Sequence, residues 1–402
     1  MNLFSVILLL GTAHGLFLAL ALLHAPTGNV TAHRLLAAIT LVFALDLGGE
    51  FLYQTHYYAR LPYLIWIDDP LEFLYGPLAL FYVRALTRPG RFHFARRQWL
   101  HFLPVLFACL LGAPFYALAA TSKLHFVYGE STTPSADLAN LGQEAMVLLF
   151  VVQMSVYLVC AIRELLRHAR SIRDNFSYTE RIGLVWLRNL LLFFGALYLL
   201  FVLDMFAASS LGIERQVNDA LSLLTVVMFY TMGYLGLRQP AIFAQSASEF
   251  QKMPALDAEF ADIVKPAAPA SLEGNKKYKT SALDADASRL LLDELLSYMD
   301  TEKPYLDCKL TLMQLASRLG LSTNYLSQII NEQLDKNFFD FVNHYRVEAA
   351  KRCLADPDQA KQTILAIALE AGFNSKTVFY SAFRKYTGMT PSWYRQSRAT
   401  RN

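Results

Sequence analysis

The first 238 residues of the chain alternate apolar stretches of about twenty residues with short polar breaks. An α-helix rises 1.5 Å per residue, so each stretch is long enough to cross a hydrocarbon core of roughly 30 Å. We identify seven such stretches: Asn2–His24, Leu35–Tyr53, Tyr63–Leu86, Trp99–Ala119, Leu141–Arg163, Leu184–Ala207 and Val217–Leu237. The overall composition agrees, because 54% apolar with only 17% charged residues exceeds the usual values for a soluble globular chain. Residues 1–238 are therefore predicted to form a seven-helix transmembrane bundle.

Basic residues in the loops predict the orientation, since Lys and Arg accumulate on the cytoplasmic side of short connections. With the N-terminus outside, the inner loops contain Arg34, Arg88, Arg91, Arg96, Arg97, Arg163, Arg167, Arg170, Arg173, Arg181 and Arg238. The outer loops then contain Arg60, Lys123 and Arg215. We expect a multi-pass protein of a bacterial inner membrane, with the N-terminus outside and the C-terminal region in the cytoplasm. A cleaved signal peptide is not expected, because Met1–Ser5 contains no Lys or Arg.

Residues 239–284 lose the apolar periodicity and collect prolines among Ala, Ser and charged residues. Such a composition is typical of a flexible linker, for which about 45 residues would give a root-mean-square span of roughly 35 to 40 Å. The cysteines are far apart in the sequence and form no Cys-x-x-Cys motif; they are Cys109, Cys160, Cys308 and Cys353. We expect no disulfide, no metal site and no cofactor.

The C-terminal region, 285–402, contains the same helix-turn-helix pattern twice, 52 residues apart. The first copy runs Leu312, Leu315, Ala316, Leu319, Gly320, Leu321, Leu326 and Ile329, and the second runs Ile364, Ile367, Ala368, Ala371, Gly372, Phe373, Phe379 and Phe383. In each copy a small residue lets two helices touch, and the glycine four residues later permits the positive φ of a tight turn. Fold class is therefore predicted as all-α throughout, with two helix-turn-helix units in the second domain.

Capping residues mark where the helices of this domain begin. The predicted caps are Thr311, Ser322 or Thr323, Thr363 and Ser375. They place the first helix-turn-helix at about 311–332, a connecting helix at about 338–355 and the second helix-turn-helix at about 363–386. A short last helix is expected to start at the Thr390-Pro391 pair.

The region from about 285 to 397 resembles the DNA-binding domain of the AraC/XylS family of bacterial transcription regulators. The resemblance is most specific from Ala368 to Arg395, with a Gly-Phe turn, a Ser cap, two Phe on one helix face, Gly-Met-Thr-Pro and a final Tyr-Arg. It implies a protein that binds double-stranded promoter DNA. The membrane half resembles, more weakly, the seven-span front end of some such regulators at Leu74-Tyr75-Gly76-Pro77-Leu78.

In a helix-turn-helix the second helix enters the major groove, and its first exposed turn meets base edges. Removing the apolar positions from both second helices leaves the candidate DNA contacts Thr323, Asn324, Ser327, Gln328 and Asn331 in unit one, and Ser375, Lys376, Thr377, Tyr380, Ser381, Arg384 and Lys385 in unit two. Arg384 and Lys385, at the far end of the helix, are the phosphate candidates. Basic and acidic residues nearly balance across the domain, so we expect modest affinity for each domain and a homodimer on DNA.

Acidic residues inside the predicted spans would each cost about 2.5 to 3.5 kcal/mol if they faced lipid near the bilayer centre. With His14, the candidates for sensing are Asp46, Glu50, Asp68, Asp69, Glu72 and Asp204. We expect them to line a pocket, open to the outside, for a cationic or hydrogen-bonding external or membrane ligand. The alternative is that several of them lie in the headgroup zone and cap helices.

Taken together, these patterns favour a membrane-embedded one-component sensor that regulates transcription. The alternative is a transporter or channel-like protein with a regulatory DNA-binding or adaptor tail, which the absence of visible internal symmetry disfavours. An enzyme is not expected, because the sequence has no Gly-rich phosphate loop, no His-Glu-x-x-His and no kinase-type ATP segment.

Overall fold

The computed structural model describes residues 3–24, 29–88, 95–129, 134–179, 183–211, 220–221, 223–228, 231, 280–359 and 361–399. These residues form helices and turns without a named strand, and one isolated antiparallel bridge pairs Phe176 with Thr311. The chain divides into two compact units. Unit 1 comprises Met1–Arg167 and Leu184–Ala247, and unit 2 comprises His168–Gly183 and Ser248–Asn402. Most of the expected linker lies outside the described residues, and a helix begins within its last five residues, at Thr280.

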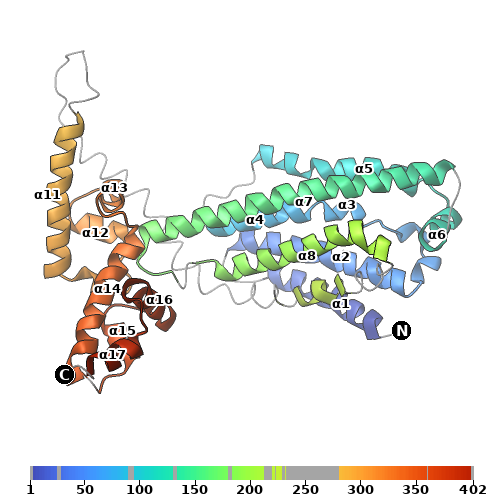
Figure 1. Ribbon diagram of the computed structural model, residues 1–402. Coiled ribbons are helices and arrows are strands. Elements are labelled where there is room, and N and C mark those ends of the chain that lie inside the picture. Colours follow the sequence, from blue (N-terminus) through green and yellow to red (C-terminus); the bar gives the residue numbers. More distant parts are fainter. Residues whose placement is uncertain are drawn as a thin grey trace, which may run out of the picture. The chain divides into compact units, whose positions relative to one another are not determined.

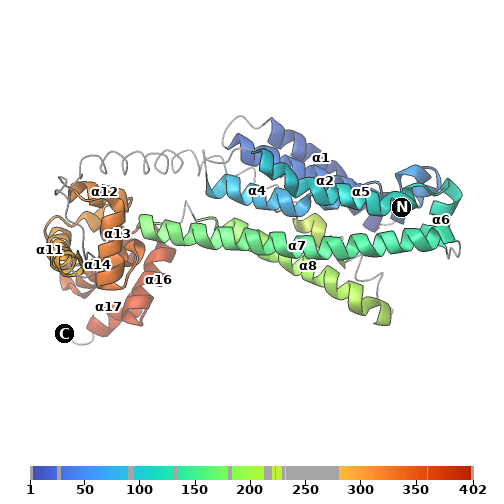
Figure 2. The same cartoon turned by 90° about the horizontal axis from the view of Figure 1, so that it is seen from above.

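Unit 1 is built from long apolar helices joined by short ones (Figure 1). The long helices are α1 (Leu3–Leu23), α2 (Val30–Gln54), α5 (Leu103–Tyr116), α7 (Pro134–Asn175) and α8 (Val185–Leu211). The shorter ones are η1 (Tyr57–Ala59), η2 (Pro62–Leu64), α3 (Asp69–Glu72), α4 (Tyr75–Thr87), η3 (Arg96–Phe102) and α6 (Ala120–Tyr128). Figure 2 shows α7 as a single uninterrupted helix, whose residues up to Arg167 belong to unit 1 and whose last turns belong to unit 2.

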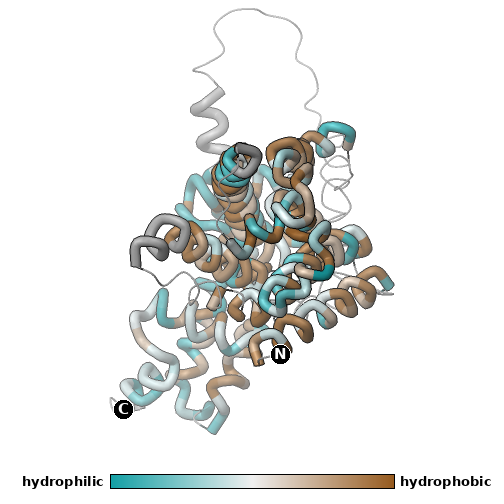
Figure 3. Tube along the Cα trace, turned by 90° about the vertical axis from the view of Figure 1, so that its right-hand side faces the viewer, coloured by the Kyte–Doolittle hydropathy of each residue, from teal (hydrophilic) through white to brown (hydrophobic). Residues whose placement is uncertain are grey.

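Five helical segments within the described residues are long and apolar enough to cross a membrane: Leu3–Leu23, Val30–Gln54, Arg96–Tyr116, Asp137–Asn175 and Val185–Leu203. They correspond to the expected stretches one, two, four, five and six. Hydrophobic colouring prevails along the helices of this unit in Figure 3. Many of their large apolar side chains are exposed, among them Phe17 at 69% and Leu110 at 69%. Such surfaces suit a lipid environment.

The third expected stretch, Tyr63–Leu86, is wrong as a single helix. The chain there forms η2, α3 and the 13-residue α4 instead. Pro70 occupies an early position of α3, where its missing N–H costs no helical hydrogen bond, whereas in a helix interior proline removes such a bond and favours a kink or a break. Trp66 adds a backbone φ of 55°, which no right-handed helix contains. The seventh stretch lies mostly outside the described residues.

The first two helices pack closely because small residues line their contact. A Cβ added at Gly11 would lie 3.2 Å from the Leu47 side chain, and one added at Gly48 would lie 3.5 Å from Thr12. Small residues let helix backbones approach in this way without a gap. The buried side chains of α1, α2 and α4 then form one core, which includes Leu8, Leu36 and Phe81.

Unit 2 contains α11 (Thr280–Thr301), η4 (Pro304–Leu306), α12 (Leu312–Arg318), α13 (Thr323–Leu334), α14 (Phe338–Ala355), η5 (Pro357–Gln359), α15 (Ile364–Glu370), α16 (Lys376–Thr387) and α17 (Pro391–Ala399). Helix α14 connects two hydrophobic cores. Its first half supplies Phe338, Phe341 and Val342 to a core shared with α11, α12 and α13. Its second half supplies Val347 and Ala350 to a core shared with α15, α16 and α17. A helix that belongs to both cores fixes the spacing of the two helix pairs.

Helix starts in unit 2 follow the capping residues predicted from the sequence. Thr311 caps α12, and its N–H donates to Gln314 Oε1 at 2.9 Å while its hydroxyl accepts from the Gln314 N–H at 3.2 Å. This is a reciprocal capping box. The caps at Ser322, Thr363 and Ser375 are likewise confirmed.

Candidate nucleic-acid interface

Each helix pair of unit 2 turns at a glycine with positive φ, as predicted. Gly320, between α12 and α13, has φ +66°, and Gly372, between α15 and α16, has φ +88°. A Cβ on Gly320 would meet nothing within 4 Å, whereas one on Gly372 would collide with the carbonyl oxygen of Tyr305. The second turn therefore depends on glycine for conformation and for space, while the first depends on it for conformation alone.

Helix α13 presents a polar face made by Asn324, Gln328 and Asn331, all exposed, with Ser327 half-buried. Side chains one turn apart on this face are hydrogen-bonded to each other. Gln328 Nε2 donates to Glu332 Oε1 at 2.9 Å, and Asn331 Nδ2 donates to Ser327 Oγ at 3.3 Å. Side-chain amides in such positions can form paired hydrogen bonds with adenine. The face has the chemistry of a base reader, with one acidic residue at its end.

Thr323 does not lie on this face, so its assignment as an outward contact is wrong. It is buried, with 7% of its surface exposed. The reason lies in the cap: Ser322 is the N-cap, accepting from the Tyr325 N–H at 3.3 Å, so Thr323 becomes the first helical residue. In that position its side chain is directed toward the domain interior instead of away from it.

Helix α16 has a corresponding face on which Lys376, Thr377 and Ser381 are exposed, with Tyr380 and the cap Ser375 half-buried. The Lys376 ammonium lies over the Tyr380 ring, 5.6 Å from its centroid. A cation held on an aromatic ring in this way is restricted in direction yet remains available to a negative partner.

The far end of α16 carries two basic residues whose surroundings differ. The ammonium of Lys385 donates to Asp340 Oδ1 at 2.7 Å, so Lys385 is paired with a carboxylate of α14. Arg384 is exposed and, among the described residues, has no ion-pair partner. Of the two phosphate candidates, Arg384 is the one whose charge is not already neutralised.

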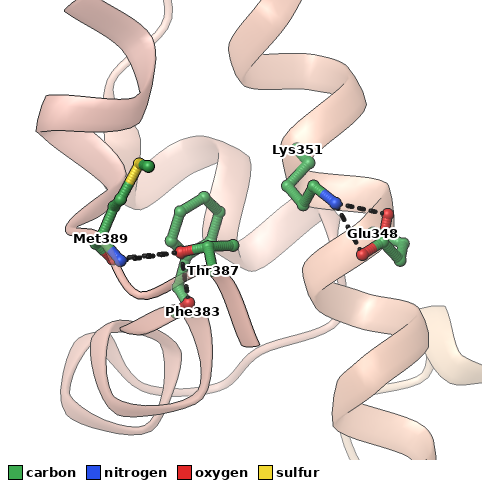
Figure 4. A network of polar contacts seen from close by, with 5 residues as sticks. All are labelled: Glu348, Lys351, Phe383, Thr387 and Met389. Carbon is green, nitrogen blue, oxygen red and sulfur yellow. Dashed lines mark hydrogen bonds and ion pairs between the residues drawn. The ribbon is translucent and has the colours of Figure 1, made fainter. Parts of the chain in front are cut away.

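The end of α16 is held by hydrogen bonds from one side chain (Figure 4). Thr387 Oγ1 donates to the Phe383 carbonyl oxygen at 2.6 Å and accepts from the Met389 N–H at 3.2 Å. Gly388 then reverses the chain at φ +73°. The same figure shows Lys351 on α14, whose ammonium donates to both oxygens of Glu348 at 2.8 and 2.9 Å.

A buried arginine that sequence patterns did not single out holds α14 to the segment before α12. Arg346 is 1% exposed, and its guanidinium donates to the carbonyl oxygens of Tyr305 at 2.7 Å and Asp307 at 2.8 Å. It also lies 5.9 Å from the centroid of the Phe373 ring, which belongs to the second helix pair. Burial lowers the pKa of Arg346 to about 10, so the group is still protonated at neutral pH. One feature of the sequence indicates that Arg346 is buried: it lies at helical spacing from apolar residues such as Val342 and Ala350.

In unit 1 most of the predicted sensing residues gather around the first turn of α3. A Cβ added at Gly49 of α2 would lie 2.6 Å from Asp68 Oδ2, so this carboxylate lies against the α2 backbone. Asp69 and Glu72 belong to α3, which packs against α2, the helix that carries Asp46. Glu50 Oε1 accepts from Gln54 Nε2 at 2.8 Å.

The remaining two candidates lie on other helices. His14 is half-buried on α1, and Asp204 belongs to α8, where its side chain lies outside the described residues. A separate groove between α2, α4 and α8 has an apolar lining that includes Phe43, Tyr82 and Leu191. The cysteines are all free, and the described residues contain no group of three or more His, Cys, Asp or Glu that could hold a metal ion.

Comparison with known families identifies the class of the C-terminal unit. Residues 315–397, which include both glycine turns, match a family model described as a helix-turn-helix domain. The C-terminal part of the chain therefore carries a helix-turn-helix domain of the AraC type, and its relatives over this region are transcription regulators.

Among these relatives is the melibiose operon regulatory protein of Escherichia coli strain K12, which is 36% identical over 90 residues, or 22% of this chain and 29% of the relative. The HTH-type transcriptional regulator YtdP of Bacillus subtilis is 35% identical over 92 residues, or 23% of this chain and 12% of the relative. The match thus spans less than a third of either relative. A solved protein of unknown function from Listeria innocua is 30% identical, with 26% of this chain and 94% of that chain covered at a TM-score of 0.23.

Proposed function

We propose that this chain is a membrane-embedded one-component transcription regulator of a bacterial inner membrane. Its two helix-turn-helix units bind promoter DNA sequence-specifically, as a pair of domains from two chains. Its transmembrane part senses a ligand from outside or from the membrane and controls that binding. The N-terminus lies outside, and the DNA-binding domain lies in the cytoplasm.

The observation that carries the DNA-binding part of this proposal is the similarity of the exposed faces of α13 and α16. Both helices follow a glycine turn, begin at a serine cap and expose polar side chains at the start: Asn324 and Gln328 in one, Lys376 and Thr377 in the other. A shared helix, α14, fixes their separation. Two reading helices on one rigid frame suit successive major-groove faces about one helical turn apart.

Immunoprecipitation of chromatin with the intact chain, followed by sequencing, tests this function. We expect enrichment of a small set of promoters that share a sequence motif. Footprints of the purified chain on those promoters should then cover two successive major-groove segments for each domain. Enrichment without a shared motif, or protection of a single groove segment, would contradict a sequence-specific reader with two units.

Replacing Lys376 by Ala should weaken binding by about 1 to 3 kcal/mol if its ammonium contacts a base. The loss should be uneven across operator variants, because a base contact is lost only where the correct base was present. Binding titrations of the intact chain with a panel of single-base variants measure this. Lys361→Ala, which removes an exposed lysine ahead of α15, is the matched control; equal losses in the two variants would show a general charge effect.

Replacing Arg384 by Ala should instead weaken all sequences alike. A phosphate contact releases counterions from DNA, so its loss should reduce the slope of log K against log salt by about one unit. Titrations at four or more salt concentrations give that slope. The same test on Lys385→Ala should show a smaller change, because Asp340 already pairs with this lysine; a larger change at Lys385 would reverse the assignment.

For the sensing part we propose the acidic group formed by Asp68, Asp69 and Glu72, with Asp46 and Glu50 of the neighbouring helix. Like charges held this close favour a cationic or hydrogen-bond-donating ligand, because such a ligand relieves their repulsion. The group lies where the third apolar stretch is broken into short elements, so the backbone around it is not a regular span. A ligand can control DNA binding only by preferring one state of the helices.

Neutral substitutions Asp69→Asn and Glu72→Gln should therefore change promoter occupancy several-fold in cells, in the same direction for both, at an unchanged amount of inserted protein. They relieve the same repulsion that a cation would relieve. The control is Glu144→Gln, an exposed acid on α7. Occupancy of wild-type strength in both variants, or an equal change in the control, would remove this group from the sensing mechanism.

A further inference from the structure

A short segment from the middle of the chain belongs to the same compact unit as the helix-turn-helix domain. It starts at the last residue of α7 and consists of Asn175–Tyr178, which we call the docking segment. Phe176 and Ser177 are 1% and 0% exposed, and Tyr178 is 9% exposed. A segment joining two apolar helices would ordinarily be solvated. The burial of three consecutive side chains shows that the segment is packed within unit 2 instead of being solvated.

The docking segment pairs with the backbone just before α12. Phe176 and Thr311 form an antiparallel bridge, and the N–H and hydroxyl of Ser177 both donate to the Leu310 carbonyl oxygen, at 3.2 and 2.7 Å. Thr311 is also the N-cap of α12. The bridge therefore lies at the point where the first helix-turn-helix begins.

The buried Arg346 binds the docking segment from the other side. Its guanidinium donates to the Ser177 carbonyl oxygen at 2.9 Å and to Ser177 Oγ at 3.0 Å. The same guanidinium bonds Tyr305 and Asp307 within the domain. One cation thus joins the docking segment, the turn before α12 and the connecting helix α14. Displacing the segment would leave two donors of a buried cation without these acceptors, which is costly.

The docking segment is joined directly to unit 1 through helix α7. Helix α7 is continuous from Pro134 to Asn175, and its residues up to Arg167 belong to unit 1. A helix transmits rotation and translation along its axis, whereas a flexible linker does not. Helix α7 therefore links the two units through continuous helical backbone, and residues 239–279 link them a second time along the chain.

We propose that the docking segment is the site through which the membrane part controls the DNA-binding domain. Seated against Leu310 and Arg346, it holds the start of α12 in the arrangement that binds DNA. A change in α7 that withdraws it lowers promoter occupancy. This inference rests on the proposed function, and its partner is a segment of the same chain.

Two insertions in the intact chain test the coupling through α7. Two glycines inserted between Arg167 and His168 keep every docking residue but interrupt the helix, and we expect promoter occupancy to change at least fivefold per inserted molecule. The same two glycines placed between Ser271 and Leu272 should change it less than twofold. Equal occupancy in the two insertion variants would overturn the proposal.

Two point variants test the contacts that the docking segment makes with Leu310 and Arg346. Ser177→Ala removes the hydroxyl shared by Leu310 and Arg346 and should lower occupancy at least fivefold. Ser171→Ala, the same change one turn and a half earlier in the chain, should leave occupancy unchanged. Occupancy that is equal in these two variants would overturn the proposal. If even the wild-type chain occupies no promoter, DNA binding itself is refuted, which is a separate and recognisable result.

The substitutions Phe176→Cys and Thr311→Cys allow a disulfide to report whether the docking segment is in place. Its yield should depend on the continuity of α7 only if α7 controls the position of the segment. Antiparallel bridge partners have Cα atoms about 4.5 to 5.5 Å apart, within the range that a disulfide spans. In isolated membranes exposed to an oxidant, the yield should be high in the wild-type background and at least twofold lower with the two glycines after Arg167. An equal yield in both backgrounds, or no crosslink in either, would overturn the proposal.

Discussion

Replacing Gly372 by Ala should destabilise the helix-turn-helix domain more than the same change at Gly320 or Gly388, where a Cβ would have open space. A left-handed backbone costs an L-residue roughly 1 to 2 kcal/mol. At φ +88° the new Cβ would also collide with the Tyr305 carbonyl oxygen, which is backbone and already accepts from Arg346. Forcing the two segments apart should add about 1 to 3 kcal/mol. We expect a total loss of roughly 2 to 5 kcal/mol.

Gly320→Ala is the matched control, because φ is +66° there and a Cβ would have open space. Its loss should be confined to the conformational cost of roughly 1 to 2 kcal/mol. Protease resistance of residues 285–402 in the purified intact chain, followed against temperature, measures both. At about 4 °C per kcal/mol for a domain of this size, the two midpoints should differ by about 4 to 12 °C. Equal midpoints would show that the turn can open without disturbing Tyr305.

Replacing Arg346 by Met should destabilise the domain by a comparable amount. It removes the donor for three carbonyl oxygens, on Tyr305, Asp307 and Ser177, and leaves those buried acceptors without this partner. An unsatisfied buried acceptor costs about 1 to 3 kcal/mol, so we expect a loss of roughly 3 to 5 kcal/mol after partial relaxation. Arg346→Lys should recover only part of it, because a single ammonium cannot present the planar fork that reaches several carbonyls.

The protease assay applies here too, with Arg352→Met as the control. Arg352 lies on the same helix and is exposed, so its loss should change the midpoint by less than about 2 °C, within the usual range of surface substitutions. A stability equal to wild type in Arg346→Met would mean that water replaces the guanidinium. In that case the docking segment would not depend on Arg346.

Local signals predicted much of unit 2 because they act between neighbours in the chain. A threonine or serine cap accepts from an N–H two or three residues later, and a glycine turn needs only its own backbone freedom. The caps at Thr311 and Ser375 and the positive φ at Gly320 and Gly372 are therefore confirmed without tertiary information. These local signals did not distinguish between the adjacent candidate caps Ser322 and Thr323. In the structure Ser322 is the cap, and Thr323 is the first residue of the helix and is buried.

In unit 1 the apolar stretches predicted where five long apolar helical segments lie, but neither their exact lengths nor their continuity. The third stretch has the composition from which a span is predicted, yet Pro70 and the φ of Trp66 interrupt it. Hydropathy sums a window of residues, whereas a break depends on single backbone positions. The group of acids around Asp68 follows from that break, since it brings α3 against α2.

The sequence by itself determined the helical class, the apolar segments, the glycine turns and the polar faces of α13 and α16, because each depends on residues within a few positions of one another. Only the tertiary structure decided which distant segments meet. Ser177 and Leu310 are 133 residues apart in the chain, and Ser177 and Arg346 are 169 apart. No periodicity encodes such a pair, because its energy exists only after both segments have folded and water has been excluded from between them.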